Sequence, residues 1–102
     1  MPGSTSIDIL VTYDVTTESS AGRRRLRKVA QICEGFGQRV QKSVFECRVT
    51  AAQLEELEDR LRRAMAEDED SLRIYRLAGP RERHVRILGV LPPYDIREPL
   101  IV

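Results

Sequence analysis

A carboxylate at the end of a predicted strand is the first group in this chain whose type and position could support chemistry. Asp14 directly follows Tyr13 at the end of the β-rich stretch 7–13. It can bind a hard cation such as Mg²⁺ through oxygen, although one carboxylate is a weak site. In a dimer, two Asp14 side chains could share one ion, lower the pKa of a water and polarise a phosphodiester. The alternative is that Asp14 only hydrogen-bonds to the loop 15–20.

A second candidate site is the cluster of cations near the start of a predicted helix. Residues 22–48 carry eight Lys or Arg against two Glu, whereas residues 55–70 carry eight acids against three Arg. On a helix, Arg24, Arg27 and Lys28 share one side, where the positive end of the helix dipole helps them to bind phosphates. We therefore expect a basic face for a polyanion and an acidic face turned away from it. An ordinary solvated helix face is the alternative.

Arg39 and Phe45 flank a predicted hairpin and form a third candidate site. An arginine and an exposed aromatic ring could bind a nucleic-acid strand by charge and stacking. The alternative for Phe45 is a place in the core. His84 is the only histidine, and the two cysteines match neither a disulfide framework nor a zinc motif. Any chemistry must therefore use carboxylates, arginines and the backbone.

The first strand and helix must position Asp14 and the cations. The strand over residues 7–13 places its odd-numbered side chains on one face. A helix follows from residue 21 or 22, capped by Ser19 or Ser20. Its apolar stripe faces the core and consists of Leu26, Val29, Ala30 and Cys33. We expect Gly35 and Gly37 to end this helix by adopting left-handed conformations.

The second half of the chain predicts a hairpin, a helix and two strands. Residues 38–49 form a short strand, a tight turn near 41–43 and a longer strand. Residues 50–53 are a capping box that opens a second helix. Strands follow over 72–77 and 84–89. Three acid-first i,i+4 pairs lie on the second helix, namely Glu56–Arg60, Glu58–Arg62 and Asp59–Arg63.

This order of elements, βαββαβ with an extra C-terminal strand, predicts an α+β, ferredoxin-like two-layer sandwich. We assign residues 1–90 to the domain and residues 91–102 to a C-terminal tail. The helices cover one side of such a sheet, yet Leu10 and Tyr75 place apolar groups on the other side. We therefore predict a homodimer packed sheet to sheet, in which the tail packs on the partner.

Composition limits the class of protein. The chain has 102 residues, a net charge of +1 and 41% hydrophobic residues, which is typical of one globular domain. No apolar run approaches the roughly 20 residues of a membrane span. No basic residues precede the first apolar stretch, as they would in a signal peptide. We expect a cytoplasmic protein without a membrane partner.

Four segments together resemble the Cas-two family, the small CRISPR-associated proteins of spacer acquisition. They are VTYD, RRRLRKVA, GQRVQKSVFEC and LRIYRL, which begin at residues 11, 23, 37 and 72. The resemblance implies a ferredoxin-like homodimer and a catalytic Tyr13–Asp14 pair with Asp14 as the Mg²⁺ ligand. It also implies that Arg24 or Arg27, with Arg39 and Phe45, binds nucleic acid.

The resemblance supports two functions of different classes. One is a metal-dependent endoribonuclease that cleaves single-stranded RNA, or duplex DNA in some relatives. The other is an adaptor, whose dimer binds two dimers of the Cas-one integrase and contacts the phosphates of the prespacer DNA without reading its sequence. We expect the role in spacer acquisition together with nuclease activity. A purely structural adaptor and a toxin-like RNA interferase are the alternatives.

Overall fold

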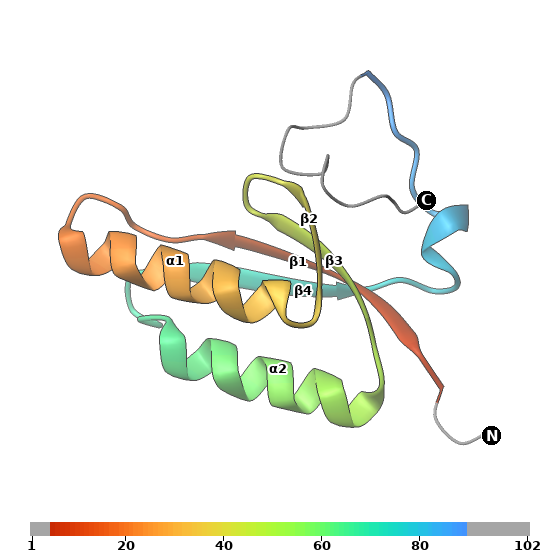
Figure 1. Ribbon diagram of the computed structural model, residues 1–102, viewed down its shortest axis with the longest axis horizontal. Helices are drawn as coiled ribbons and strands as arrows, with labels where there is room; N and C mark the ends of the chain where they lie inside the picture. The colour runs from red at the N-terminus through yellow and green to blue at the C-terminus, as the bar shows by residue number, and fades with distance from the viewer. Residues whose placement is uncertain (1–4, 90–102) are drawn as a thin grey trace.

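Two helices cover one face of a four-stranded antiparallel sheet in the computed structural model, which describes residues 5–89 (Figure 1). The elements, in chain order, are β1 (Ile7–Asp14), α1 (Ser20–Glu34), β2 (Gly37–Gln41), β3 (Val44–Val49), α2 (Ala51–Ala64), β4 (Ser71–Arg76) and a 3₁₀ turn, η1 (Arg81–Arg83). The sheet order is β2-β3-β1-β4. This arrangement confirms the predicted α+β, βαββαβ fold.

The core lies between the sheet and the helices. On the central strand β1, Ile9, Val11 and Tyr13 face the helices and are at most 5% exposed. The helices contribute Val29 and Cys33 from α1 and Leu57 and Leu61 from α2, and β3 contributes Phe45, Cys47 and Val49. The alternation predicted for the first strand therefore corresponds to the observed buried face.

Both helix starts are capped as the sequence predicts. The Ser19 hydroxyl accepts a hydrogen bond from the Gly22 backbone nitrogen at 3.0 Å. At the start of α2, Thr50 and Gln53 form a reciprocal capping box at 3.1 and 2.8 Å. Such caps satisfy backbone N–H groups that have no partner within the helix.

The prediction that Gly35 and Gly37 adopt left-handed conformations at the end of α1 is wrong. Gly35 is right-handed, with φ −73°, and Gly37 does not have a positive φ either. Gly37 instead lies directly opposite Cys47 on β3. A Cβ on Gly37 would stand 2.8 Å from the Cys47 Cα atom and would collide with the Glu46 carbonyl oxygen and the Cys47 sulfur. The position needs a small residue because two strands approach closely, and not because the backbone is left-handed.

The ion pairs on α2 only partly follow the predicted spacing. Glu56 pairs with Arg60 at 2.7 Å, and Asp59 pairs with Arg63. The predicted Glu58–Arg62 pair is not formed, because Arg62 pairs with Glu67 beyond the helix end at 3.4 Å. None of the helices within residues 5–89 has the length and apolarity needed to cross a membrane.

The predicted strand over residues 84–89 is wrong. After β4 the chain forms η1, and residues 85–89 have no strand pairing. The Arg81 backbone nitrogen donates to Asp8 Oδ2 at 2.7 Å, and the Arg81 guanidinium pairs with Glu46. These contacts bend the chain across the end of the sheet, so that it does not extend along a strand. The tail 91–102, and its predicted packing on a partner, lies outside the described residues.

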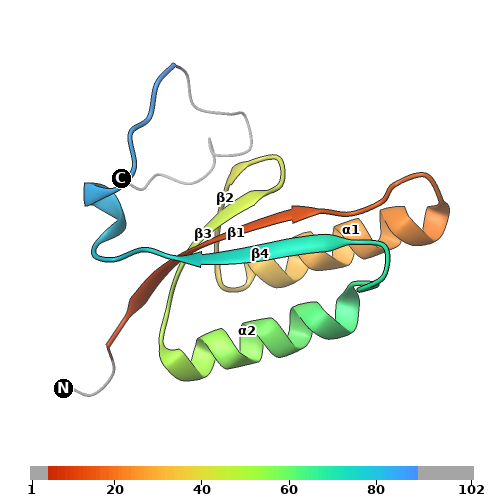
Figure 2. The same ribbon diagram turned by 180° about the vertical axis from the view of Figure 1, so that it is seen from behind.

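The face of the sheet opposite the helices is open in the single chain (Figure 2). Leu10 of β1 and Tyr75 of β4 are cross-strand partners on this face. The Tyr75 side chain is among the exposed large hydrophobic groups, at 44%. A homodimer that covers this face stays a prediction.

Candidate functional site

Asp14 is exposed and chemically available. It is the last residue of β1, and strand alternation directs it away from the helix side that Tyr13 occupies. Within residues 5–89, the Asp14 carboxylate makes neither a hydrogen bond nor an ion pair. The alternative role, a hydrogen bond to the loop 15–20, is therefore not seen. Asp70 and the Glu69 backbone oxygen bind that loop instead, at the amide and hydroxyl of Thr16.

One chain offers a hard cation only part of a coordination site. The free carboxylate of Asp14 fits the oxygen ligands that Mg²⁺ prefers. However, the described residues hold no group of three or more His, Cys, Asp or Glu side chains placed to share a metal ion. The residues present therefore fit a divalent cation only if a second copy of the chain, or a bound phosphate, supplies further oxygens.

Tyr13 lies on the other side of β1, away from Asp14. The residue is 5% exposed, and its ring stacks on Phe45 with centroids 6.2 Å apart and an angle of 25°. Burial raises the pKa of the Tyr13 hydroxyl, and the charge of Arg39 partly opposes that rise. The structure therefore does not bring the two members of the predicted catalytic pair to one surface.

Phe45 takes the place in the core that was the alternative to a nucleic-acid contact. It is 0% exposed and belongs to the core, so its ring is not presented to a ligand. Arg39 is half-buried, and its guanidinium carbon lies 5.3 Å from the centre of the Phe45 ring, a cation–π distance. Phe45 thus supports both Tyr13 and Arg39 from within the core.

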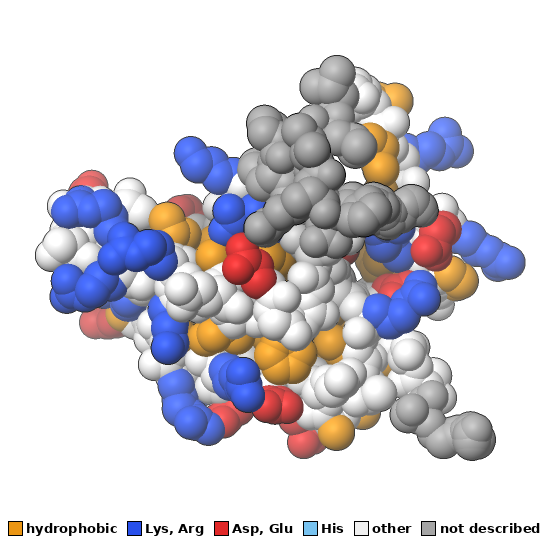
Figure 3. All heavy atoms as spheres, in the orientation of Figure 1, with side chains coloured by type: hydrophobic (Ala, Val, Ile, Leu, Met, Phe, Trp, Pro, Cys, Tyr) orange, Lys and Arg blue, Asp and Glu red, His pale blue; other side chains and the backbone are white. Residues whose placement is uncertain are grey.

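Three cations on α1 form an exposed surface that we call the basic ridge, defined by Arg24, Arg27 and Lys28. All three are exposed, and in the described part of the chain none of them has an acidic or hydrogen-bonding partner. They line a shallow hollow with Ala21, Arg25, Gln31 and Ala64. Figure 3 shows Lys and Arg side chains gathered over the N-terminal half of α1. The ridge therefore offers unneutralised charge to a polyanion.

The two other arginines of this stretch are engaged within the protein. Arg25 pairs with Asp70 at 2.8 Å and with Glu69 at 3.2 Å. Arg23 donates to the Thr17 backbone oxygen at 3.2 Å. Two acids of residues 55–70 therefore lie against the basic helix, and not on a face turned away from it. The chain returns from α2 to β4 beside the start of α1, which brings acidic residues against the basic helix.

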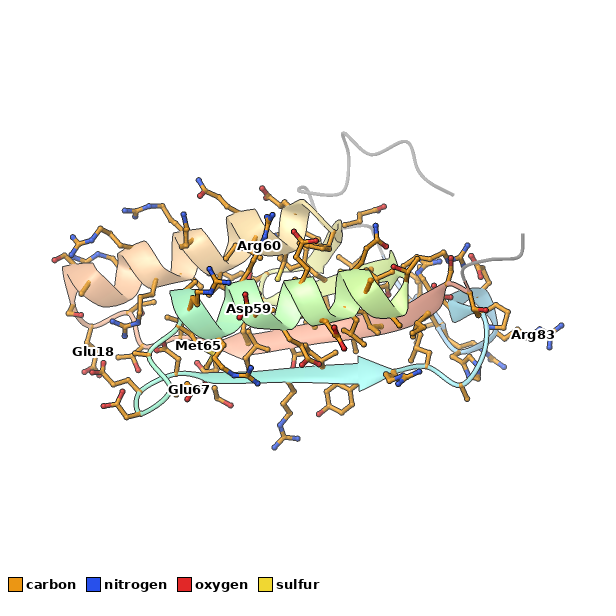
Figure 4. All side chains as sticks on the ribbon, turned by 90° about the horizontal axis from the view of Figure 1, so that it is seen from below. Glu18, Asp59, Arg60, Met65, Glu67 and Arg83 are labelled. Atoms are coloured by element: carbon orange, nitrogen blue, oxygen red, sulfur yellow. The ribbon has the colours of Figure 1, made fainter. Side chains whose placement is uncertain are left out.

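Asp14 and the basic ridge lie at the same end of the molecule. The sheet register places Asp14 opposite Ser71. Asp70, one residue earlier, binds Arg25, which is adjacent to Arg24 of the ridge. In Figure 1 this is the end where β1 stops and α1 begins. Figure 4 places Glu18 and Glu67 at this end and Arg83 at the opposite end, so His84, which follows Arg83, is far from the loop after Asp14.

Sequence reasoning missed two buried carboxylates, Asp70 and Asp8, which are 8% and 9% exposed. Burial opposes ionisation of Asp70, but hydrogen bonds from Arg25 and two backbone amides outweigh it and lower the pKa. Two hydrogen bonds from Arg48, at 2.7 and 3.1 Å, chiefly lower the pKa of Asp8. An aspartate inside the apolar run 7–13 was the only sequence signal for Asp8. Nothing comparable marked Asp70 within its acidic turn.

Both cysteines are poor nucleophiles in this fold. Cys33 and Cys47 are buried and carry free thiols. Burial raises the pKa of each thiol to about 12. Because the thiolate is the reactive form, neither cysteine is a candidate for covalent chemistry.

Residues 8–85 match the family model described as CRISPR associated protein Cas2. The chain belongs to the Cas2 family. It is 55% identical over 94 residues to CRISPR-associated endoribonuclease Cas2 1 of Moorella thermoacetica, covering 92% of this chain and 98% of that protein. It is 50% identical to CRISPR-associated endonuclease Cas2 of Halalkalibacterium halodurans, over 91% of this chain and 97% of the relative.

A solved structure of a Cas2 protein shares the fold. The crystal structure of Streptococcus pyogenes Cas2 at pH 6.5 superposes with a TM-score of 0.74 and 51% sequence identity. The match covers 80% of this chain and 99% of that one. The Cas2 match begins at Asp8 and therefore includes Asp14, the basic ridge and η1.

Proposed function

We propose that this Cas2 chain is a dimeric nucleic-acid-binding protein of CRISPR spacer acquisition that also cleaves single-stranded RNA with Mg²⁺. One observation carries the proposal: a free carboxylate, Asp14, and an unneutralised basic ridge lie at the same end of the fold. The names of the relatives, endoribonuclease and endonuclease, support the activity.

Binding is the task of the basic ridge. Arg27 and Lys28 lie three and four residues beyond Arg24, which is about 4.5–6 Å of rise along the helix axis. Cations separated in this way along one side of a helix can contact more than one phosphate of a bound strand. Contacts of this kind position the backbone without reading its sequence. The ridge therefore suits RNA strands and duplex DNA alike.

Asp14 is the catalytic residue of the proposal. Its carboxylate would bind the cation, together with Asp14 of a second copy across the open face of the sheet. Mg²⁺, when bound, supplies a Lewis acid that polarises a phosphodiester and lowers the pKa of water. The ridge arginines would hold the phosphates beside the scissile one and stabilise the charge that develops. Tyr13 supports β1 from the core and has no contact with the substrate in this scheme.

An adaptor without nuclease activity is the second candidate. The absence of a three-ligand cluster in the described residues favours it, because one carboxylate per chain is a minimal metal site. As an adaptor, the dimer would bind dimers of the Cas-one integrase and place the prespacer DNA along the basic ridge. This role needs the ridge and the open face of the sheet, but not Asp14.

Replacing Asp14 separates the two candidates. The assay measures cleavage of a single-stranded RNA with Mg²⁺ and with EDTA, for wild type and for Asp14→Asn. The matched control is Glu18→Gln, an exposed acid in the following loop. We expect Asp14→Asn to lower cleavage at least about 100-fold and the control to leave it unchanged. Cleavage that survives in Asp14→Asn would reject the metal-ligand role.

A second assay tests the adaptor role. Integration of a prespacer duplex by the Cas-one integrase is measured with wild type, Asp14→Asn and an Arg24→Ala/Arg27→Ala variant. We expect integration to persist in Asp14→Asn and to fall in the ridge variant, because this role places the DNA on the ridge and does not use Asp14. Integration that is independent of the ridge would place the DNA surface elsewhere.

A further inference from the structure

The carboxylate of Asp70 links three separate segments of the chain. Its side chain is 0% exposed. Oδ2 accepts from Arg25 Nε at 2.8 Å and from the Ala66 backbone nitrogen at 2.9 Å. Oδ1 accepts from the Thr16 backbone nitrogen at 3.2 Å and from Arg25 Nη2 at 3.3 Å. Asp70 therefore joins α1, the residue after the α2 C-cap and the loop that follows β1.

The loop bound by Asp70 begins immediately after Asp14. Thr16 is two residues beyond Asp14, and its hydroxyl donates to the Glu69 backbone oxygen at 3.0 Å as a second tie. The same loop packs against the start of α1, where a Cβ on Gly22 would collide with the Thr16 carbonyl. The backbone of Asp14 is thus fixed in two ways, by its pairing with Ser71 in the sheet and by the hydrogen bonds that bind Thr16, two residues later. Its own carboxylate is left free.

The contacts of Asp70 with Arg25, Ala66 and Thr16, which we call the Asp70 junction, also hold the basic ridge. The Arg25 guanidinium binds the Asp70 carboxylate, and the Arg25 side chain is 19% exposed. Arg24 and Arg27 project from other positions on the helix surface and stay exposed. Since successive helix residues are about 100° apart, a contact that fixes Arg25 also fixes the rotation of α1 and the direction of the ridge. A carboxylate that accepts two hydrogen bonds from one guanidinium is well suited to fixing a helix in this way.

We propose that Asp70, through Thr16 and Arg25, is a positioning residue that sets where Asp14 lies relative to the basic ridge. A strand that passes from the ridge around the end of the sheet then brings a phosphodiester to the Asp14 carboxylate. The inference rests on the proposed nuclease function. Neither Asp70 nor Arg25 touches substrate or metal in this scheme, and their effect passes through the loop and the helix.

A positioning role differs measurably from a role in stability alone. Loss of stability lowers the fraction of folded protein, so binding and cleavage fall together. Loss of positioning leaves the ridge exposed and competent to bind, while the bound strand is misplaced relative to Asp14. Changes of this kind beside a metal site typically cost about 10- to 100-fold in activity or metal affinity.

The test compares Asp70→Asn and Arg25→Gln with wild type and with Glu69→Gln. The control, Glu69→Gln, neutralises an exposed acid that contacts the same arginine. Four quantities are measured: folded fraction by circular dichroism, RNA affinity, cleavage rate at saturating RNA, and hydrogen exchange of the Thr16 amide. For both test variants we expect affinity within about twofold of wild type and cleavage lowered about tenfold or more. In Asp70→Asn, Thr16 exchange should also be about tenfold faster.

Each failure has its own signature. Wild-type cleavage in a folded Asp70→Asn would overturn the positioning role and leave the proposed function standing. A parallel fall of affinity and cleavage that matches the loss of folded protein would show that the junction only stabilises the fold. This result would also overturn the inference. Wild-type protein without Asp14-dependent cleavage would instead overturn the proposed nuclease, and this inference with it. Arg25→Gln provides the test if Asp70→Asn does not fold.

Discussion

The ring of Tyr13 and the carboxylate of Asp14 lie on opposite sides of β1, although the two residues are adjacent in sequence. Tyr13 faces the helices and stacks on Phe45, whereas Asp14 is exposed at the strand end. Alternation along an extended strand requires this separation. A pair that looks like one motif in the sequence therefore has one member in the core and one at the surface.

Replacing Tyr13 by Phe should leave cleavage unchanged. The Tyr13 hydroxyl is buried near Arg39 and has no hydrogen-bond partner within residues 5–89. Its removal should therefore change the free energy of unfolding by less than about 1 kcal/mol. Tyr13→Ala, which also removes the stacked ring, should lower that free energy by about 3–5 kcal/mol. If a folded Tyr13→Phe protein no longer cleaved RNA, the hydroxyl would have to take part in the reaction.

Neutralising the basic ridge should weaken binding in a salt-dependent way. Arg24→Ala/Arg27→Ala removes two phosphate contacts, so the slope of log K against log salt should fall by about 2. The matched control is Arg60→Ala/Arg63→Ala, because these exposed arginines of α2 are already paired with acids. Binding is measured by fluorescence anisotropy at several salt concentrations. An unchanged slope in the ridge variant would contradict the assignment.

Acid should destabilise the fold through Asp8 and Asp70. The pKa of each carboxyl is lowered from 3.8 in the folded state. Their ionised forms therefore stabilise the fold well above pH 3.8. This contribution is lost as the pH falls below that value towards the folded-state pKa. Urea unfolding at about pH 7 and about pH 3 measures the loss.

Asp70→Asn supplies the control for that titration. At about pH 7 this variant should be less stable than wild type by about 1–3 kcal/mol, because hydrogen bonds to a buried charge are lost. It should also show a smaller further loss in acid. Asp59→Asn, at an exposed pair, should behave as wild type does. A wild-type fold equally stable at both pH values would refute the contribution.

The open face of the sheet should be the dimer interface. Tyr75→Glu places a charge on that face, on the edge strand β4 and opposite Leu10 of β1. We expect this variant to sediment as a monomer at micromolar concentration with an unchanged circular dichroism spectrum, whereas wild type sediments as a dimer. Gln31→Glu, an exposed change on α1, is the control. A Tyr75→Glu dimer would place the interface elsewhere.

Local sequence signals predicted the regular elements well. The strand alternation of residues 7–13, the Ser19 cap and the Thr50–Gln53 capping box each act within a few residues, and each is seen in the structure. Contacts between distant residues could not be predicted in this way. Arg62 pairs with Glu67 and not with Glu58, because the chain beyond α2 brings a second acid within reach.

The candidate site shows the same limit. The type and position of Asp14 identified it as an available carboxylate. The burial of Phe45, by contrast, depends on the packing of the sheet against both helices. The bent segment at η1 depends on Asp8, which is 73 residues away from Arg81 in the chain. The Asp70 junction spans 54 residues to Thr16 and 45 to Arg25. No periodic pattern encodes separations of that kind.

The acidic turn beside α1 places charges of opposite sign side by side on one surface. Glu67, Asp68 and Glu69 are exposed next to the start of the basic helix. Sodium or potassium ions screen the helix and release a bound strand. The exposed acids of the turn repel phosphate, so a bound strand is directed along the helix and away from residues 67–69.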